Sequence, residues 1–123
     1  IITQTQENEN FRKVLYTGDK SQLVVMNILP GDDIGEEIHD KTEQTLFFLS
    51  GVGEGTLNDE KFPLHPGIVV VVAPGTRHNF RNTGQENLKL YTIYTPAHHI
   101  NNRVHQTKTD ATNDIEDTTF GEK

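Results

Sequence analysis

Short runs of apolar residues, each ended by turn residues, recur along the middle of the chain. Pro-Gly, Ser-Gly and Asn-Asp pairs separate these runs, and such pairs end strands through the turn conformations that they favour. No stretch between positions 22 and 96 repeats its apolar residues with a helical period. The pattern therefore predicts an all-β sandwich or barrel. The expected strands cover residues 22–29, 44–49, 53–57, 68–73, 77–81 and 88–95.

Three further segments complete the organisation that the sequence predicts. The run 68–73 (IVVVVA) is apolar on both faces, which predicts a central strand. The run 11–16 (FRKVLY) is expected to be an edge strand or an exchanged strand, and symmetric pairing in a homodimer would cover such an edge. From about position 107 the chain is polar, so we expect a flexible tail or a short helix near 110–115. The predicted parts are an N-terminal segment (1–20), a barrel (21–96) and a partly flexible C-terminal tail (97–123).

Composition and charge narrow the class of partner. The chain has 123 residues, which fits one domain, and a formal net charge of −7, which disfavours nucleic acid. It has no cysteine, so disulfides and thiolate metal ligands are excluded. The N-terminal residues lack the basic and apolar regions of a signal peptide, and no apolar run approaches the ~20 residues of a membrane helix. We therefore expect a cytoplasmic protein with a small-molecule substrate and no membrane partner.

Four side chains are candidates for a metal site. Glu37 and His39 are two positions apart, so in a strand they project to the same face. Gln44 begins the next strand after a short polar loop, and a hairpin can bring it opposite that pair. His78 lies on a third strand, just after a Pro-Gly-Thr turn. Carboxylate, imidazole and amide oxygen together suit Mn²⁺, Fe²⁺, Ni²⁺ or Zn²⁺, although the spacing alone leaves open that these residues are structural.

The stretch from Gly31 to Gly51 resembles the first sequence motif of the cupin family. Five residues separate Gly31 from Glu37-Ile38-His39, four separate His39 from Gln44, and six separate Gln44 from Gly51. In the usual motif, a histidine stands where this chain has Glu37, and a glutamate stands where it has Gln44. One acidic ligand is thus kept at a changed position.

The stretch 67–82 resembles the second cupin motif, with Gly67, a Pro-Gly turn, His78 and Asn82 in order. The phrases GEEIH, PGTRHNFRNTG and LKLYTIYTPAHH are similar to those of a small single-domain subgroup described as phosphomannose-isomerase-like. The resemblance implies a double-stranded β-helix, or jelly-roll, barrel with one divalent transition metal (Mn, Fe, Ni or Zn) per chain. The ligands that it implies are Glu37, His39, Gln44 and His78.

A cupin barrel does not fix the reaction, because the same fold serves many functions. The leading hypothesis is a metal-dependent enzyme, isomerase- or epimerase-like, acting on a sugar or a keto or hydroxy acid. The alternatives are an iron-dependent dioxygenase and a non-catalytic small-molecule binding protein. His98, His99 and His105 follow the last strand and either fold over the barrel mouth as acid–base groups or form an exposed linker; His99 and His105 are the catalytic candidates. Only Lys41 and Arg77 are basic and near the ligands in sequence, which disfavours a sugar phosphate.

Overall fold

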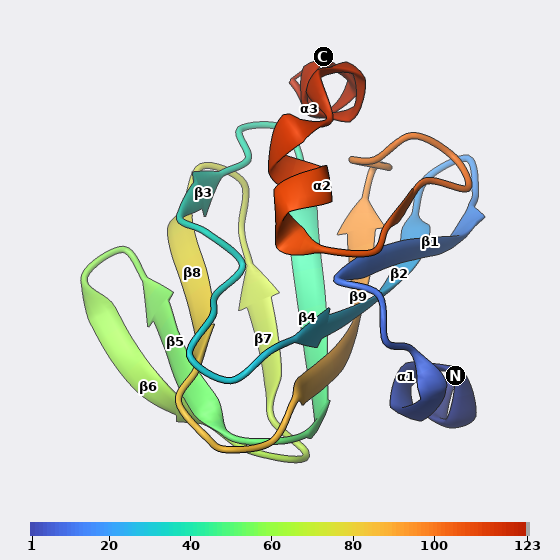
Figure 1. Ribbon diagram of the computed structural model, residues 1–123. Helices are drawn as coiled ribbons and strands as arrows, with labels where there is room; N and C mark the ends of the chain where they lie inside the picture. The colour runs from blue at the N-terminus through green and yellow to red at the C-terminus, as the bar shows by residue number, and fades with distance from the viewer. Residues whose placement is uncertain (123) are drawn as a thin grey trace.

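The structure, a computed structural model that describes residues 1–122, consists of two facing antiparallel β-sheets with short helices near both ends of the chain (Figure 1). The strands are β1 (Arg12–Thr17), β2 (Gln22–Ile28), β3 (Glu37–Ile38), β4 (Glu43–Ser50), β5 (Gly53–Leu57), β6 (Glu60–Leu64), β7 (Val69–Val72), β8 (Arg77–Asn82), β9 (Leu88–Thr95) and β10 (Val104–His105). The helices are α1 (Ile2–Glu7), α2 (Lys108–Asn113) and α3 (Ile115–Gly121). One sheet has the order β10-β1-β2-β9-β4-β7 and the other the order β3-β8-β5-β6. The double-stranded β-helix predicted from the sequence is confirmed.

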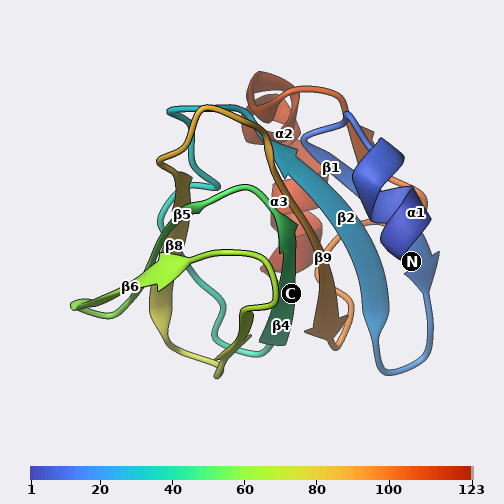
Figure 2. The same cartoon turned by 90° about the horizontal axis from the view of Figure 1, so that it is seen from below.

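The core lies between the two sheets, which Figure 2 shows facing each other with β2, β9 and β4 on one side and β5, β6 and β8 on the other. Burial alternates along the strands, as the period of two requires: Leu46 and Phe48 of β4 point inward, as do Leu90 of β9 and Phe80 of β8. These side chains form one hydrophobic cluster. Buried polar side chains accompany this apolar core, among them His39, Gln44 and His78.

The valine-rich strand β7 is an edge strand, so the prediction of a central strand over 68–73 is wrong. It is last in the order of its sheet and pairs only with β4. Val69 and Val71 are 54% and 55% exposed, whereas Val70 and Val72 point into the core. A run of identical apolar residues carries no alternation, so the sequence could not show which face is exposed.

Strand β1 is not an edge strand, so the prediction of an edge or exchanged strand over 11–16 is wrong. It lies between β2 and β10, and the short β10 pairs with Arg12 and Lys13 from the same chain. The open edge of this sheet on the opposite side is β7. The homodimer stays a prediction, for which β7 offers an unpaired edge.

The C-terminal residues form two helices at the barrel end near β3 (Figure 1). The helix expected near 110–115 is therefore split, with Asp114 between α2 and α3. Thr107 and Asp110 form a reciprocal capping box at the start of α2. Lys108 then joins α2 to the barrel by ion pairs with Asp32, at 3.2 Å, and with Asp33. In the part of the chain that the structure describes, no helix is long and apolar enough to cross a membrane.

Candidate metal centre

Three of the four candidate ligands lie together at one end of the barrel. Glu37 of β3 and His78 of β8 are directly opposite each other in the antiparallel ladder, and His39 follows β3 two positions after Glu37. One ligand atom from each of the three lies within 4.8 Å of the other two. Ile38, between them, points outward and is 54% exposed, as strand alternation requires.

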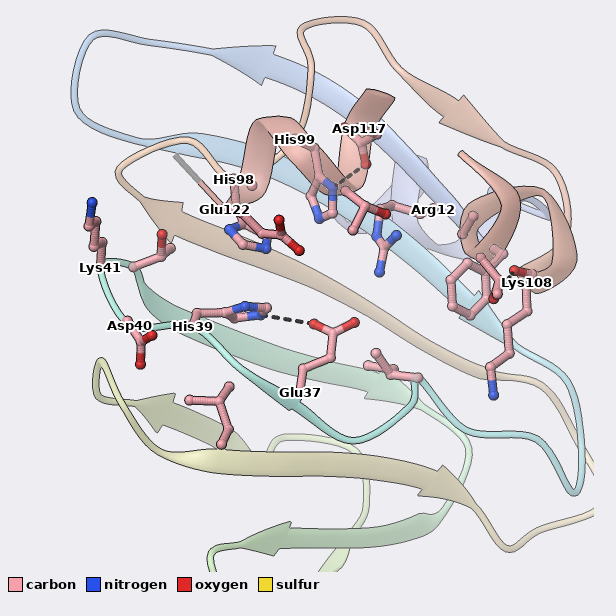
Figure 3. A pocket seen from close by; sticks show the side chains of 18 residues that line it. Arg12, Glu37, His39, Asp40, Lys41, His98, His99, Lys108, Asp117 and Glu122 are labelled. Carbon is pink, nitrogen blue, oxygen red and sulfur yellow. Dashed lines mark hydrogen bonds and ion pairs between the residues drawn. The ribbon is translucent and has the colours of Figure 1, made fainter. Parts of the chain in front are cut away.

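Both imidazoles of this cluster have a ring nitrogen that can serve as a metal ligand. Nε2 of His39 lies 2.9 Å from Oε2 of Glu37, the contact marked in Figure 3, yet this buried nitrogen has no hydrogen bond of acceptable geometry. Nδ1 of His78 lies 2.9 Å from the carbonyl oxygen of Thr76, which can only accept, so Nδ1 carries the proton and Nε2 has the lone pair. A backbone partner of this kind commonly orients a metal-ligating histidine. The donor set therefore fits a divalent transition metal.

The electrostatics keep these groups in the form that binds metal. Burial opposes ionisation of Glu37, but the imidazole of His39 and the positive charge of Arg12 outweigh it and lower the pKa of Glu37 to about 2. Burial lowers the pKa of His78, so its ring is neutral near pH 7. Because metal ligands must be deprotonated, the cluster needs to release few protons on binding.

The hairpin expected to bring Gln44 opposite Glu37 and His39 does not form, because β3 pairs with β8 in one sheet and β4 lies in the facing sheet between β7 and β9. Gln44 lies on β4, is 3% exposed, and its Nε2 donates to Oγ1 of Thr92 at 3.1 Å. The Thr92 hydroxyl donates to the carbonyl of Thr45 at 2.9 Å, so it accepts from the amide nitrogen of Gln44. This bond orients the amide and leaves its oxygen free of Thr92.

A cavity of about 600 Å³ opens above the cluster (Figure 3). Residues of β1, of the segment around β3, of the segment after β9 and of both C-terminal helices line it. The polar residues that line the cavity include Arg12, Glu37, His39, His98, His99 and Asp117. Helices α2 and α3 therefore form part of the wall of the candidate site.

His98 and His99 fold back over the barrel mouth, so the expectation of an exposed linker is wrong for them. The ring centroid of His98 is 4.0 Å from that of His39, and His99 is 6% exposed. Nδ1 of His99 lies 2.7 Å from Oδ2 of Asp117 on α3, while its buried Nε2 has no hydrogen-bond partner among residues 1–122. Burial and the charge of Arg12 lower the pKa of His99 to about 4, against the opposing effect of Asp117, so a neutral ring offers Nε2 as a base.

His105 is also buried, but it is not among the residues that line the cavity. It lies on β10 and its Nε2 is 2.9 Å from Oδ2 of Asp114, the residue that caps α3. Arg103 approaches the same carboxylate at 3.5 Å. The structure thus places His105 in a contact that anchors α3, whereas it places His99 in the cavity.

Arg12, Tyr94 and Asp117 belong to the site and were not predicted from the sequence. Arg12 alternates with Val14 on the inward face of β1, so the period of two along this strand was a usable signal for it. Tyr94 alternates inward in the same way on β9, where its ring is 5.0 Å from that of His99. Asp117 had no such signal, because the polar tail gave no period from which α3 could be aligned with the barrel.

Known proteins share the sequence and fold of this chain. The Cupin_2 family, described as a cupin domain, matches residues 24–94. YrkC of Bacillus subtilis (strain 168) is 40% identical over 117 residues, which cover 90% of this chain and 63% of YrkC, and a relative from Acanthamoeba polyphaga mimivirus is 37% identical over 80% of this chain and 64% of its own length. The chain thus spans less than two thirds of these two relatives. The crystal structure of BH2720 from Bacillus halodurans has a TM-score of 0.89 at 37% identity, covering 90% of this chain and 89% of that one.

Proposed function

The chain belongs to the Cupin_2 family of cupin domains, and from that premise we propose that it is a metal-dependent enzyme that moves a proton on a small polar metabolite. The observation that carries the proposal is one shared cavity. Glu37, His39 and His99 line it, and a ligand atom of His78 lies within 4.8 Å of those of Glu37 and His39. The buried Nε2 of His99 has no hydrogen-bond partner among residues 1–122. Its volume of about 600 Å³ suits a small metabolite.

The metal would be Mn, Fe, Ni or Zn, held by Glu37, His39, His78 and the amide oxygen of Gln44. This set has one carboxylate and three neutral ligands. A bound divalent ion would supply Lewis-acid polarisation of a substrate oxygen. The remaining roles belong to side chains of this chain.

His99 is the proposed base. Its Nε2 would accept a proton from a substrate carbon next to a carbonyl or carboxylate group, and the electron pair of the broken C–H bond would pass to the oxygen of that group as an enolate. Asp117, bonded to Nδ1, would hold the ring in the correct tautomer and stabilise the imidazolium. Return of the proton to a neighbouring carbon or to the other face of the same carbon completes an isomerisation or epimerisation.

The paired His99 and Asp117 favour proton transfer over the two other functions considered. A non-catalytic binding protein needs no oriented base, and an iron-dependent dioxygenase needs an oxygen site rather than a second histidine with a buried carboxylate. The finer assignment to a phosphomannose-isomerase-like reaction has less support, because Lys108 on the cavity wall is already paired with Asp32 and Asp33, which leaves Arg12 and Lys41 as the other lysine and arginine residues of the lining.

Solvent deuterium exchange tests the proposal. Metal-loaded protein is incubated in D₂O, without oxygen, with a panel of hydroxy acids, keto acids and sugars, and incorporation at carbon is followed by NMR. We expect exchange into one substrate class, and we expect His99→Gln to abolish it while the bound metal is retained. His105→Gln is the matched control, since it changes another buried histidine with an aspartate partner outside the cavity. No exchange with any compound, or turnover only with iron and oxygen, would reject proton transfer.

A further inference from the structure

Arg12 is a buried cation on the wall of the cavity. It is 6% exposed, although arginine is rarely buried without a paired charge. Its backbone is fixed on both sides, because Arg12 pairs with His105 of β10 and with Met26 of β2. The guanidinium carbon lies 5.2 Å from the centroid of the Phe11 ring. The side chain is therefore rigidly placed.

No carboxylate in residues 1–122 forms an ion pair with Arg12 within 4.0 Å, and its buried Nε has no hydrogen-bond partner there. Figure 3 shows the guanidinium pointing into the cavity toward the carboxylate of Glu37, with no interaction marked between them. Each other arginine of the chain (positions 77, 81 and 103) is paired with an aspartate or glutamate. The hydroxyl of Tyr94 is a hydrogen-bond partner of the Arg12 side chain, but it is not an anion. Burying a charge without a counter-ion is costly, so Arg12 indicates a missing anion.

The position of Arg12 relates it to both halves of the proposed site. Arg12, Glu37 and His99 line the same cavity, as Figure 3 shows. The guanidinium therefore faces a cavity that it shares with a metal ligand and with the proposed base. A group bound to it would lie beside both.

We propose that Arg12 binds the carboxylate of the substrate, so that the substrate is a small hydroxy or keto acid rather than a neutral sugar. A guanidinium offers a planar fork of donors that matches a carboxylate. Arg12 lines the same cavity as the ligands Glu37 and His39. A carboxylate bound at Arg12 could therefore carry a neighbouring oxygen toward these ligands. This inference rests on the proposed function, because it names the substrate class of the same site.

The experiment compares a hydroxy acid with its neutral amide. Binding of glycolate and of glycolamide to Zn²⁺-loaded protein is measured by calorimetry for the wild type, Arg12→Met and Arg12→Lys. Lys13→Met is the matched control: it removes a positive charge from the next residue of the same strand, which is exposed. Metal content and melting temperature are measured for every variant.

We expect Arg12→Met to weaken glycolate binding by about 10- to 100-fold, as for loss of charge-assisted hydrogen bonds, and to leave glycolamide binding unchanged. The affinity of Arg12→Lys for glycolate should lie between those of the wild type and Arg12→Met, and the affinity of Lys13→Met should match that of the wild type. Arg12→Met should still fold, because methionine packs well at a buried position and no carboxylate lies within 4.0 Å of the guanidinium.

Equal glycolate binding by the wild type and Arg12→Met, with metal retained in both, would overturn the role of Arg12 and leave the metal proposal intact. A loss of glycolate and glycolamide binding together, with a lower melting temperature, would also overturn it and make Arg12 structural. If Arg12→Met does not fold, an unweakened Arg12→Lys would count against the proposal. Absence of Zn²⁺ from the wild type is a different failure, that of the proposed function.

Discussion

Gln22 binds both polar backbone groups of His99. Its side-chain oxygen accepts the N–H of His99 at 3.0 Å, and its nitrogen donates to the carbonyl of His99 at 2.7 Å. The same oxygen accepts the N–H of His98 at 3.1 Å. Gln22 is 1% exposed on an interior strand of the larger sheet, so one rigid amide fixes the segment that carries the proposed base.

Gln22→Leu should therefore reduce catalysis without removing metal. The change leaves the N–H and carbonyl of His99 buried and unpaired, so the free energy of unfolding should fall by about 2–3 kcal/mol. The rate of deuterium exchange into the substrate should fall as well, because the segment that carries His99 is no longer held in place. Urea unfolding, the exchange assay and elemental analysis check these three outcomes, and Gln6→Leu, at an exposed position of α1, serves as the control. A wild-type exchange rate in Gln22→Leu would mean that this segment does not carry the base.

Asp117→Asn should remove the base while keeping the fold and the metal. The side-chain nitrogen of Asn would donate to Nδ1 of His99, so the ring proton would move to Nε2 and the lone pair in the cavity would be lost. We expect exchange to fall by at least ~100-fold. The nitrogen NMR shifts of His99 report the change of tautomer directly. Asp114→Asn, which alters the cap of the same helix, should leave that tautomer unchanged; an unchanged tautomer in Asp117→Asn would refute the pairing.

The metal-free protein should lose stability as the pH falls from about 6.5 to about 4. Burial and the charge of Arg12 lower the pKa of His99 from 6.5 to about 4, although Asp117 opposes the shift. In this window the unfolded chain binds a proton at His99 that the folded chain does not, so the stabilisation is complete above pH 6.5 and is lost below it. Urea unfolding in EDTA should show a steeper decline for the wild type than for His99→Gln. Parallel curves would contradict a buried neutral ring.

The two Gln44 variants test the charge at the metal position. Gln44→Glu adds a carboxylate, so metal should be retained or bound more tightly, while the lower positive charge of the site should slow exchange. Gln44→Ala should weaken metal binding by about tenfold or more and reduce exchange together with it. Metal titration and the exchange assay distinguish the variants. Full exchange activity in Gln44→Glu would show that Lewis acidity is not limiting.

Local patterns in the sequence predicted a sandwich or barrel and a shared face for Glu37 and His39, whereas the jelly-roll topology and the set of four ligands were expected from the resemblance to cupins. The two-residue spacing of Glu37 and His39 places both on one face of a short strand. The contact of His78 with Glu37 could not be deduced from local spacing, because it depends on pairing between strands that are distant in the sequence. The uniform valines of β7 carried no alternation, and its edge position could not be deduced.

The C-terminal half of the cavity was beyond local patterns. Asp117 reaches His99 because α3 returns to the barrel, and that return depends on single contacts such as Lys108 with Asp33 and His105 with Asp114. Lys108 and Asp33 are far apart in the sequence, and the residues of both pairs are of polar types that are also common in flexible segments. A polar segment that folds through such pairs has the same composition as a flexible tail.

The metal content of the purified protein tests the central claim most directly. Protein prepared without chelator should carry about one divalent transition metal per chain by elemental analysis. His78→Ala should carry almost none, because it removes the ligand from β8, whereas His65→Ala, at an exposed turn, should match the wild type. A wild-type protein that holds no metal, even after incubation with excess Mn²⁺, Fe²⁺, Ni²⁺ and Zn²⁺, would contradict the account.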